Sequence, residues 1–256
     1  MIGDIQKHIF MAQQAGLEAV INISCHPDEQ EENIAFAHTH SSDALRIYTT
    51  LGYHPDLCND PEDTHILHTV DLWIATMQQH LERYPQVVAI GECGLDYYRT
   101  YHKEAQKKLF KEQILLAETF TKPVIIHLRG EIWEDFYDIL SQHPDLSCVI
   151  HCFSGTQDDA KKLLHSFPNM FLSFTGIITF KNAQETYLPI LQEVPLGRML
   201  IETDSPYLAP VPYRGQQNTS AYVVEVAKKI AEIKGLSLEE VKKITTENAK
   251  RFFGIH

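Results

Sequence analysis

The 256-residue sequence has no apolar run that approaches the roughly 20 residues needed to cross a bilayer. The stretch from Met1 to Leu17 also lacks the basic start and apolar middle of a signal peptide. No CxxC pair occurs, and the five cysteines are odd in number, as expected of reduced thiols inside a cell. We therefore predict a cytoplasmic protein that does not engage a membrane.

Positive charge is scarce, because 22 lysines and arginines face 34 acidic residues and the formal net charge is -12. This balance argues against a broad basic face that wraps duplex nucleic acid or an anionic membrane. Any polyanionic substrate would need a local cation such as a metal ion. A P-loop, a GxGxxG turn and a G-x-S-x-G elbow are also absent, so nucleotide cofactors and serine hydrolase chemistry are unsupported.

Apolar, β-branched runs recur along the chain, each separated from the next by a helix-like stretch of roughly 10 to 25 residues. The seven runs cover residues 18–24, 46–52, 87–91, 123–127, 148–152, 170–175 and 198–203. Their continuous apolar character is typical of parallel strands covered on both faces. The pattern predicts a single domain, residues 1–256, built as a (β/α)8 TIM-type barrel or as a doubly wound sheet.

The segments between the runs have helical spacing, as in residues 102–120. Near the end of the chain, Gly235 should stop one helix. Ser237 and Glu240 should then form the capping box of the last helix.

A closed barrel of this type has eight strands, and the sequence shows one fewer. The shortfall lies at the front, where residues 4–20 have the pattern of a helix that leads into a strand. A barrel without its first strand would leave unpaired edges beside the gap, so we expect that Met1 is a start set too late. An intact mass of the native protein that matches 29.3 kDa would rule this out.

Catalytic groups of parallel barrels sit on the loops that follow the carboxyl ends of the strands. The sequence places these residues there: Cys25, His26, His54, Glu92, His127, His151, Thr175, Gly176 and Asp204. Imidazole nitrogens and carboxylate oxygens are ligands for Zn²⁺, Mn²⁺ or a similar divalent ion. We therefore predict a metal site formed by Glu92, His127, His151 and Asp204.

Each of these residues also has a simpler interpretation when it is taken alone. A single histidine at a strand end is more often a hydrogen-bonded core residue than a ligand. Glu92 could cap the dipole of a following helix, and Asp204 before Ser-Pro could initiate an ordinary turn. The metal interpretation depends on all four positions occurring together.

Several blocks of the sequence resemble the TatD family of metal-dependent hydrolases. They are GECGLDYYR, KPVIIHLR, VIHCFSGT, FTGIITFKNA, LIETDSPYLAP, RGQQNTSAYV and TTENAKRFFGI, in family order. The combination of GECGLDYYR, HCFSG and ETDSPYLAP is specific, whereas any one of them alone would be weak.

This resemblance implies a barrel of the amidohydrolase kind with one or two divalent ions, Zn²⁺, Mg²⁺ or Mn²⁺, that hydrolyses phosphodiester bonds in DNA. Glu92 is similar to the carboxylate that bridges the metals. His127 and His151 resemble ligands of one ion, and Asp204 resembles the ligand that also acts as general base.

The resemblance further implies substrate-binding roles for His54 in GYHP and Arg214 in RG. Taken alone, His54 could shape the turn before Pro55, and Arg214 could be a solvated loop charge. The segment that begins at Arg214 has fewer basic residues than is usual in the family, which weakens the expected grip on a polyanion. Most members also begin with a strand that carries His-x-His, and the sequence lacks it. The triplet at residues 38–40 has the His-x-His spacing but lies toward the end of a helical stretch, which argues against its replacing the missing pair.

The resemblance and the acidic charge together predict a 3'-5' exonuclease that acts on single-stranded DNA or on strand ends, because a long duplex would bring many phosphates against a negative surface. The ion would activate a water molecule, and Asp204 would accept its proton. The same site could attack an amide, ester or aminoacyl ester bond, which is the alternative. A binding protein that has lost catalysis is a third possibility. We expect a monomer, because no heptad seam is visible.

Overall fold

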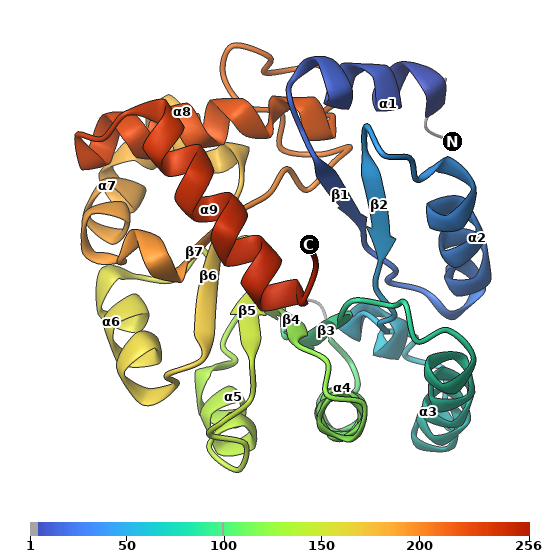
Figure 1. The fold of residues 1–256 in the computed structure, drawn as a ribbon. Coiled ribbons are helices and arrows are strands. Elements are labelled where there is room, and N and C mark those ends of the chain that lie inside the picture. Colours follow the sequence, from blue (N-terminus) through green and yellow to red (C-terminus); the bar gives the residue numbers. More distant parts are fainter. Residues whose placement is uncertain (1–4, 99) are drawn as a thin grey trace. The chain divides into compact units, whose positions relative to one another are not determined.

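The computed structural model describes residues 5–98 and 100–256. The chain divides into two compact units, the first made of Met1–Val20, Ser42–Arg46 and His151–His256. The second unit is made of Ile21–Ser41 and Ile47–Ile150. Within each unit, strands alternate with helices along the chain (Figure 1). Across the described ranges, we find no helix with the length and apolar character that crossing a bilayer requires.

The second unit contains parallel strands in sequence order. β3 (Ile90–Asp96) pairs with β4 (Val124–Arg129), and β4 pairs with β5 (Cys148–Ile150). β2 (Arg46–Thr49) pairs with β1 (Ala19–Asn22) in a separate two-stranded sheet, and both strands straddle the boundary between the units. An isolated parallel bridge joins Leu51, after β2, to Ile90 of β3, and the Val88 N–H donates to the Thr49 carbonyl.

The helices of the second unit are α2 (Gln30–His40), α3 (Ile66–Arg83), α4 (Lys103–Thr119) and α5 (Trp133–Leu140). The predicted helix over 102–120 is confirmed as α4, which packs against β3 and α3 (Figure 1). Its buried residues include Leu109, Ile114 and Ala117, the apolar positions that the helical spacing placed on one face. The core of this unit therefore lies between α4 and the strands.

The first unit holds the parallel pair β6 (Met170–Phe174) and β7 (Met199–Ile201). Its helices are α1 (Ile5–Gln14), α6 (Gln157–Ser166), α7 (Gln184–Glu193), α8 (Val223–Lys234) and α9 (Leu238–Phe253). Two predictions at the end of the chain are confirmed. Gly235 ends α8 in the left-handed conformation with φ 65°, and Ser237 with Glu240 forms the capping box of α9.

Each of the seven apolar runs overlaps a strand, but the predicted positions of Glu92 and His127 at strand ends are wrong, because β4 runs from Val124 to Arg129 and so includes His127. β3 begins at Ile90 and continues to Asp96, so Glu92 lies within the strand. The register passes from Ile90 opposite Val124 to Cys93 opposite Ile126, which leaves one extra residue on β3. This is a β-bulge, a device that bends a strand and redirects a side chain.

A glycine is required beside Glu92 because the two strands approach closely at the bulge. Gly91 has φ 138°, and a Cβ added there would lie 2.6 Å from the Ile125 carbonyl oxygen. The glycines around Glu92 therefore reflect a crowded strand pair and not the turn that their composition suggested. The single domain over residues 1–256 and the missing first strand stay predictions.

Candidate metal site

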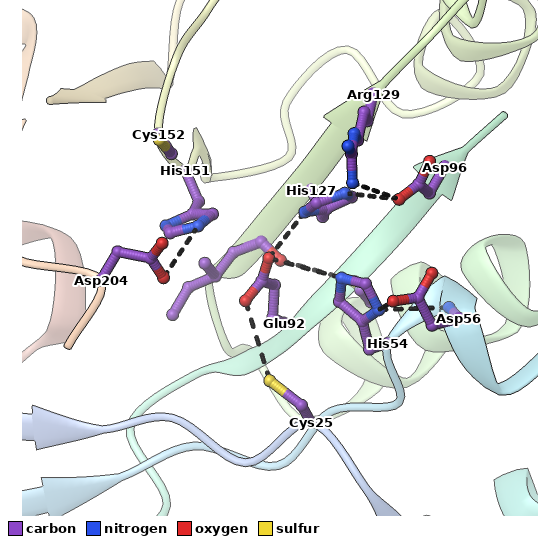
Figure 2. A network of polar contacts seen from close by, with 12 residues as sticks. Cys25, His54, Asp56, Glu92, Asp96, His127, Arg129, His151, Cys152 and Asp204 are labelled. Atoms are coloured by element: carbon purple, nitrogen blue, oxygen red, sulfur yellow. Dashed lines mark hydrogen bonds and ion pairs between the residues drawn. The ribbon is translucent and has the colours of Figure 1, made fainter. Parts of the chain in front are cut away.

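One face of the β3 and β4 pair carries the first group of polar side chains. Beyond the bulge, Glu92, Gly94 and Asp96 alternate onto one face of β3. Gly94 lies opposite His127 in the ladder and has no side chain, so the imidazole fits between the two carboxylates. His127 Nδ1 lies 2.8 Å from Glu92 Oε1, and Nε2 lies 3.4 Å from Asp96 Oδ2 (Figure 2).

Two carboxylates flank the His127 ring. Burial alone would raise the pKa of Asp96, but interaction with His127 and a hydrogen bond from the Tyr98 backbone N–H hold that pKa below its usual value. His127 Nδ1 lies at hydrogen-bond distance from Glu92 Oε1, whereas Nε2 is farther from Asp96. A carboxylate oxygen and an imidazole nitrogen are ligand types that divalent ions such as Zn²⁺ accept, so the Glu92 and His127 pair fits such an ion.

His54 joins this group, because one ligand atom each of His54, Glu92 and His127 lies within 4.8 Å of the others. His54 Nδ1 accepts the backbone N–H of Asp56 at 3.1 Å, at the start of the short helix Pro55–Cys58. Burial, together with the charge of His127, lowers the pKa of His54 and favours the neutral ring. A neutral imidazole has one proton, so Nε2 carries it.

In this geometry His54 can donate a hydrogen bond through Nε2, and it is also one of the three residues whose ligand atoms lie close enough together to hold an ion. Its Nε2 lies 3.8 Å from Glu92 Oε1, too far for a hydrogen bond to that oxygen (Figure 2). The simpler interpretation, that His54 shapes the turn before Pro55, is confirmed for Nδ1. The substrate-binding role concerns the other nitrogen and stays a prediction.

Cys25 approaches the second oxygen of Glu92. Its thiol donates a weak hydrogen bond to Glu92 Oε2 at 3.7 Å, and its carbonyl accepts the backbone N–H of His54 at 2.9 Å. Burial, followed by the charge of Glu92, raises the pKa of the thiol, so it stays protonated beside the carboxylate. Glu92 thus presents one oxygen to the two imidazoles and the other to a thiol (Figure 2).

The first unit carries a second imidazole backed by a carboxylate. His151 Nδ1 donates to Glu202 Oε2 at 2.6 Å, and the Cys152 backbone N–H donates to Glu202 Oε1 at 2.7 Å. Burial opposes ionisation of Glu202, but the charge and the hydrogen bond of His151 lower its pKa. The lone pair of His151 is therefore on Nε2, which lies 3.8 Å from Asp204 Oδ1.

Asp204 is held by the backbone around it. It adopts the left-handed conformation with φ 56°, which aspartate tolerates better than most residues. Asn218 Nδ2 donates to the carbonyls of Thr203 and Tyr207 and so fixes the loop on both sides. The predicted turn is confirmed, because the Tyr207 N–H donates to the Asp204 carbonyl, while the side chain faces His151 (Figure 2).

The remaining predicted residue, Arg214, lies on an exposed loop of the first unit. Its guanidinium carbon lies 3.8 Å from the centre of the Phe180 ring, a cation–π contact. Its role in substrate binding stays a prediction. The simpler interpretation of Glu92 as a helix cap is wrong, because α4 begins only at Lys103.

The predicted residues thus form two local groups, Glu92 with His127 and His54 in the second unit, and His151 with Asp204 in the first. Sequence reasoning missed Asp96 and Glu202, the carboxylates behind the two ligand candidates. Period-two spacing was the available signal for Asp96, which lies four residues after Glu92 on β3. Glu202 and Asp204 both follow the end of β7, so strand alternation gives no such signal for Glu202.

Comparisons with known proteins show which family the chain resembles. The family described as TatD related DNase matches residues 1–254. An uncharacterized metal-dependent hydrolase of Bacillus subtilis, YabD, is 40% identical over 213 residues, which cover 82% of this chain and 78% of YabD. The 3'-5' ssDNA/RNA exonuclease TatD of Enterobacter lignolyticus is 30% identical over 251 residues, covering 94% of this chain and 89% of its own length.

A solved structure extends the likeness to the fold. The TatD homologue YJJV of Escherichia coli matches with a TM-score of 0.84 and 26% identity, covering 99% of this chain and 93% of its own. The predicted α/β fold of the TIM-barrel type is confirmed by this likeness. Metal-dependent hydrolysis, which the family resemblance implied, is the chemistry named for the relatives. The chain belongs to the TatD-related DNase family of metal-dependent hydrolases.

Proposed function

We propose that this protein is a 3'-5' exonuclease that hydrolyses phosphodiester bonds at the ends of single-stranded DNA with one or two divalent ions, Zn²⁺, Mg²⁺ or Mn²⁺. The observation that carries the proposal is the neutral imidazole of His54, which holds an N–H beside the Glu92 and His127 pair. An N–H donor next to a metal suits the charged oxygen of a phosphodiester. The name of the Enterobacter relative supports the same substrate.

The donor atoms of the chain define the other roles. When bound, the divalent ion lowers the pKa of water toward neutrality and offsets negative charge on the phosphoryl group. Glu92 and His127 hold it with the oxygen and nitrogen ligands that such ions prefer. We propose that His151 and Asp204 complete the ligand set, and that Asp204 accepts the proton of the attacking water.

His54 supplies specificity for an anionic oxygen. Its Nδ1 is occupied by the backbone of Asp56, which fixes the ring and aims Nε2–H at the substrate side of Glu92. Burial keeps the ring neutral, so it donates a hydrogen bond without carrying a proton away. The same donor could serve an oxyanion on carbon, and the experiment therefore includes ester and amide substrates.

The test begins with protein stripped by a chelator and reloaded separately with Zn²⁺, Mg²⁺ or Mn²⁺. Each form is incubated with single-stranded DNA labelled at its 5' end, with the same strand labelled at its 3' end, and with a panel of aryl esters, amides and aminoacyl esters. A 3'-5' exonuclease gives a shortening ladder from the 5' label and immediate mononucleotide release from the 3' label. Turnover of the esters or amides alone would refute the phosphodiester proposal.

The variant Glu92→Gln tests the site itself. It keeps the shape of the side chain but removes the charge that faces His127, so turnover should fall by about 100-fold or more and bound metal should decrease. Glu32→Gln, on the exposed side of α2, is the matched control and should leave both unchanged. Near-wild-type, chelator-sensitive activity in Glu92→Gln would show that this ligand assignment is wrong.

A further inference from the structure

The segment between β3 and α4 exposes two tyrosines. Tyr98 is 58% exposed and Tyr101 is 68% exposed, both within a few residues of the carboxyl end of β3. Single exposed aromatics are common and need no explanation. Tyr97 gives a comparison on the same segment, because its hydroxyl donates to Asp135 at 2.7 Å and has a structural partner.

Tyr98 is tied directly to the candidate metal site. Its backbone N–H donates to Asp96 Oδ1 at 3.0 Å, and the other oxygen of Asp96 lies 3.4 Å from Nε2 of His127. The tyrosine is therefore anchored to the carboxylate that orients a proposed metal ligand. Asp96 contacts both the Tyr98 backbone and the His127 ring, so a displacement of Tyr98 would be transmitted to His127 through the Asp96 side chain.

A cation lies over the Tyr98 ring. The guanidinium carbon of Arg129 is 4.2 Å from the ring centre, and its Nη1 lies 3.8 Å from Asp96 Oδ2. Arg129 lies opposite Asp96 in the β3 and β4 ladder, so the strand register places the charge where the tyrosine is anchored. The ring is thus stiffened by a cation–π contact while more than half of the residue remains open to solvent.

We propose that Tyr98, supported by Arg129, is a stacking platform for a terminal base of a single-stranded nucleic acid. The proposal rests on the nuclease function above and identifies a side chain that binds its substrate. Every base has an aromatic face, so such a platform tolerates all sequences, as an exonuclease requires. A duplex is disfavoured, because its bases are already stacked on one another.

The platform also accounts for affinity in an acidic protein. A net charge of -12 argues against a broad basic face that would attract phosphates along a strand. Stacking on an uncharged ring gives binding that needs few cations, and Arg129 supplies one positive charge close to the ring. Binding should accordingly depend on bases near the cleaved end more than on strand length.

The test compares Tyr98→Ala with Tyr98→Phe, which keeps the ring. Phe10→Ala removes a similarly exposed aromatic, 60% exposed on α1, and serves as the control. KM for a short single strand should rise about 5- to 150-fold in Tyr98→Ala, which corresponds to the roughly 1–3 kcal/mol of one stacked base, with little change in kcat. An oligonucleotide whose terminal residues are abasic should show no difference between wild type and Tyr98→Ala.

A second measurement works without turnover. A strand with terminal 2-aminopurine is titrated with chelator-stripped protein, and quenching by wild type and by Tyr98→Phe but not by Tyr98→Ala supports the platform. DNA hydrolysis with unchanged KM and quenching in Tyr98→Ala refutes the platform and leaves the nuclease function standing. Quenching that depends on Tyr98 without hydrolysis under any metal refutes the nuclease and leaves a base-binding surface. If the protein neither quenches the 2-aminopurine nor hydrolyses DNA with any metal, both the platform and the nuclease function are refuted.

Discussion

Replacing Glu202 with glutamine should weaken divalent-metal binding by about 10- to 100-fold without unfolding the protein. Glu202 accepts hydrogen bonds on its two oxygens from His151 Nδ1–H at 2.6 Å and from the Cys152 N–H at 2.7 Å, and the Ser173 side chain also hydrogen-bonds to it. A glutamine amide has nearly the same shape but offers one oxygen acceptor and one NH₂ donor. It can therefore satisfy only one of the two donors.

The weaker metal binding would follow from a change in the tautomer of His151. If the amide oxygen accepts from Cys152, the amide NH₂ faces His151 Nδ1, and the ring is stable only with its proton on Nε2. That nitrogen faces Asp204 and would then have no lone pair to offer a metal. Partners behind metal-binding histidines are typically worth 10- to 100-fold in metal affinity, which is roughly 1.4–2.7 kcal/mol.

The assay is a titration of chelator-stripped protein with Zn²⁺ against a competing chromogenic chelator, with thermal unfolding to confirm the fold. Glu232→Gln is the control, because Glu232 is exposed on α8 and its carboxylate pairs with Lys229 of the same helix. In a His151→Ala background, Glu202→Gln should cause no further loss. Metal affinity within twofold of wild type in Glu202→Gln would refute the reasoning.

Two predictions concern stability. Gly94→Ala should lower the free energy of unfolding by about 3 kcal/mol or more, because its φ is 145° and the new Cβ would overlap the His127 carbonyl oxygen. Gly197→Ala is the control, because nothing lies within 4 Å of the added Cβ. Its free energy of unfolding, measured like that of Gly94→Ala by urea titration, should change by less than about 1 kcal/mol. The hydroxyl of Tyr97 lowers the pKa of Asp135, so the stabilisation is present above the unfolded pKa of about 3.9 and is lost as pH falls through the folded value. The Tm difference between wild type and Asp135→Asn should shrink from about pH 6 to about pH 3, and a constant difference would contradict this.

The strands were predictable because a buried parallel strand needs a continuous apolar run, and each of the seven runs overlaps one. The extent of β3 was not, because the glycines around Glu92 have the composition of a turn. Their reason is steric. Gly91 and Gly94 allow close contact with β4, so the ladder continues where composition alone predicts an end.

Residue types at strand ends gave the candidate ligands, but the partners of those ligands lay outside the prediction. Asp96 was hidden because it occupies the last position of a strand that was expected to stop at residue 91. Glu202 was overlooked beside Asp204, because both follow the end of β7 and strand alternation gives no signal there. Both carboxylates act through an imidazole, and a contact between a strand end and a residue on a different strand requires the fold to be known.

The chemistry of the three histidines differs for a reason that no sequence pattern contains. Each imidazole has two nitrogens, and the group that contacts one nitrogen decides what the other can do. In His151 a carboxylate takes the Nδ1 proton and leaves a lone pair on Nε2. In His54 a backbone N–H occupies Nδ1, so the proton is on Nε2 and the ring donates. In His127 a carboxylate lies near each nitrogen, so both ring nitrogens have an acidic neighbour. Residues of one type are thus divided by their partners into candidate ligands, His127 within β4 and His151 after β5, and a candidate donor, His54.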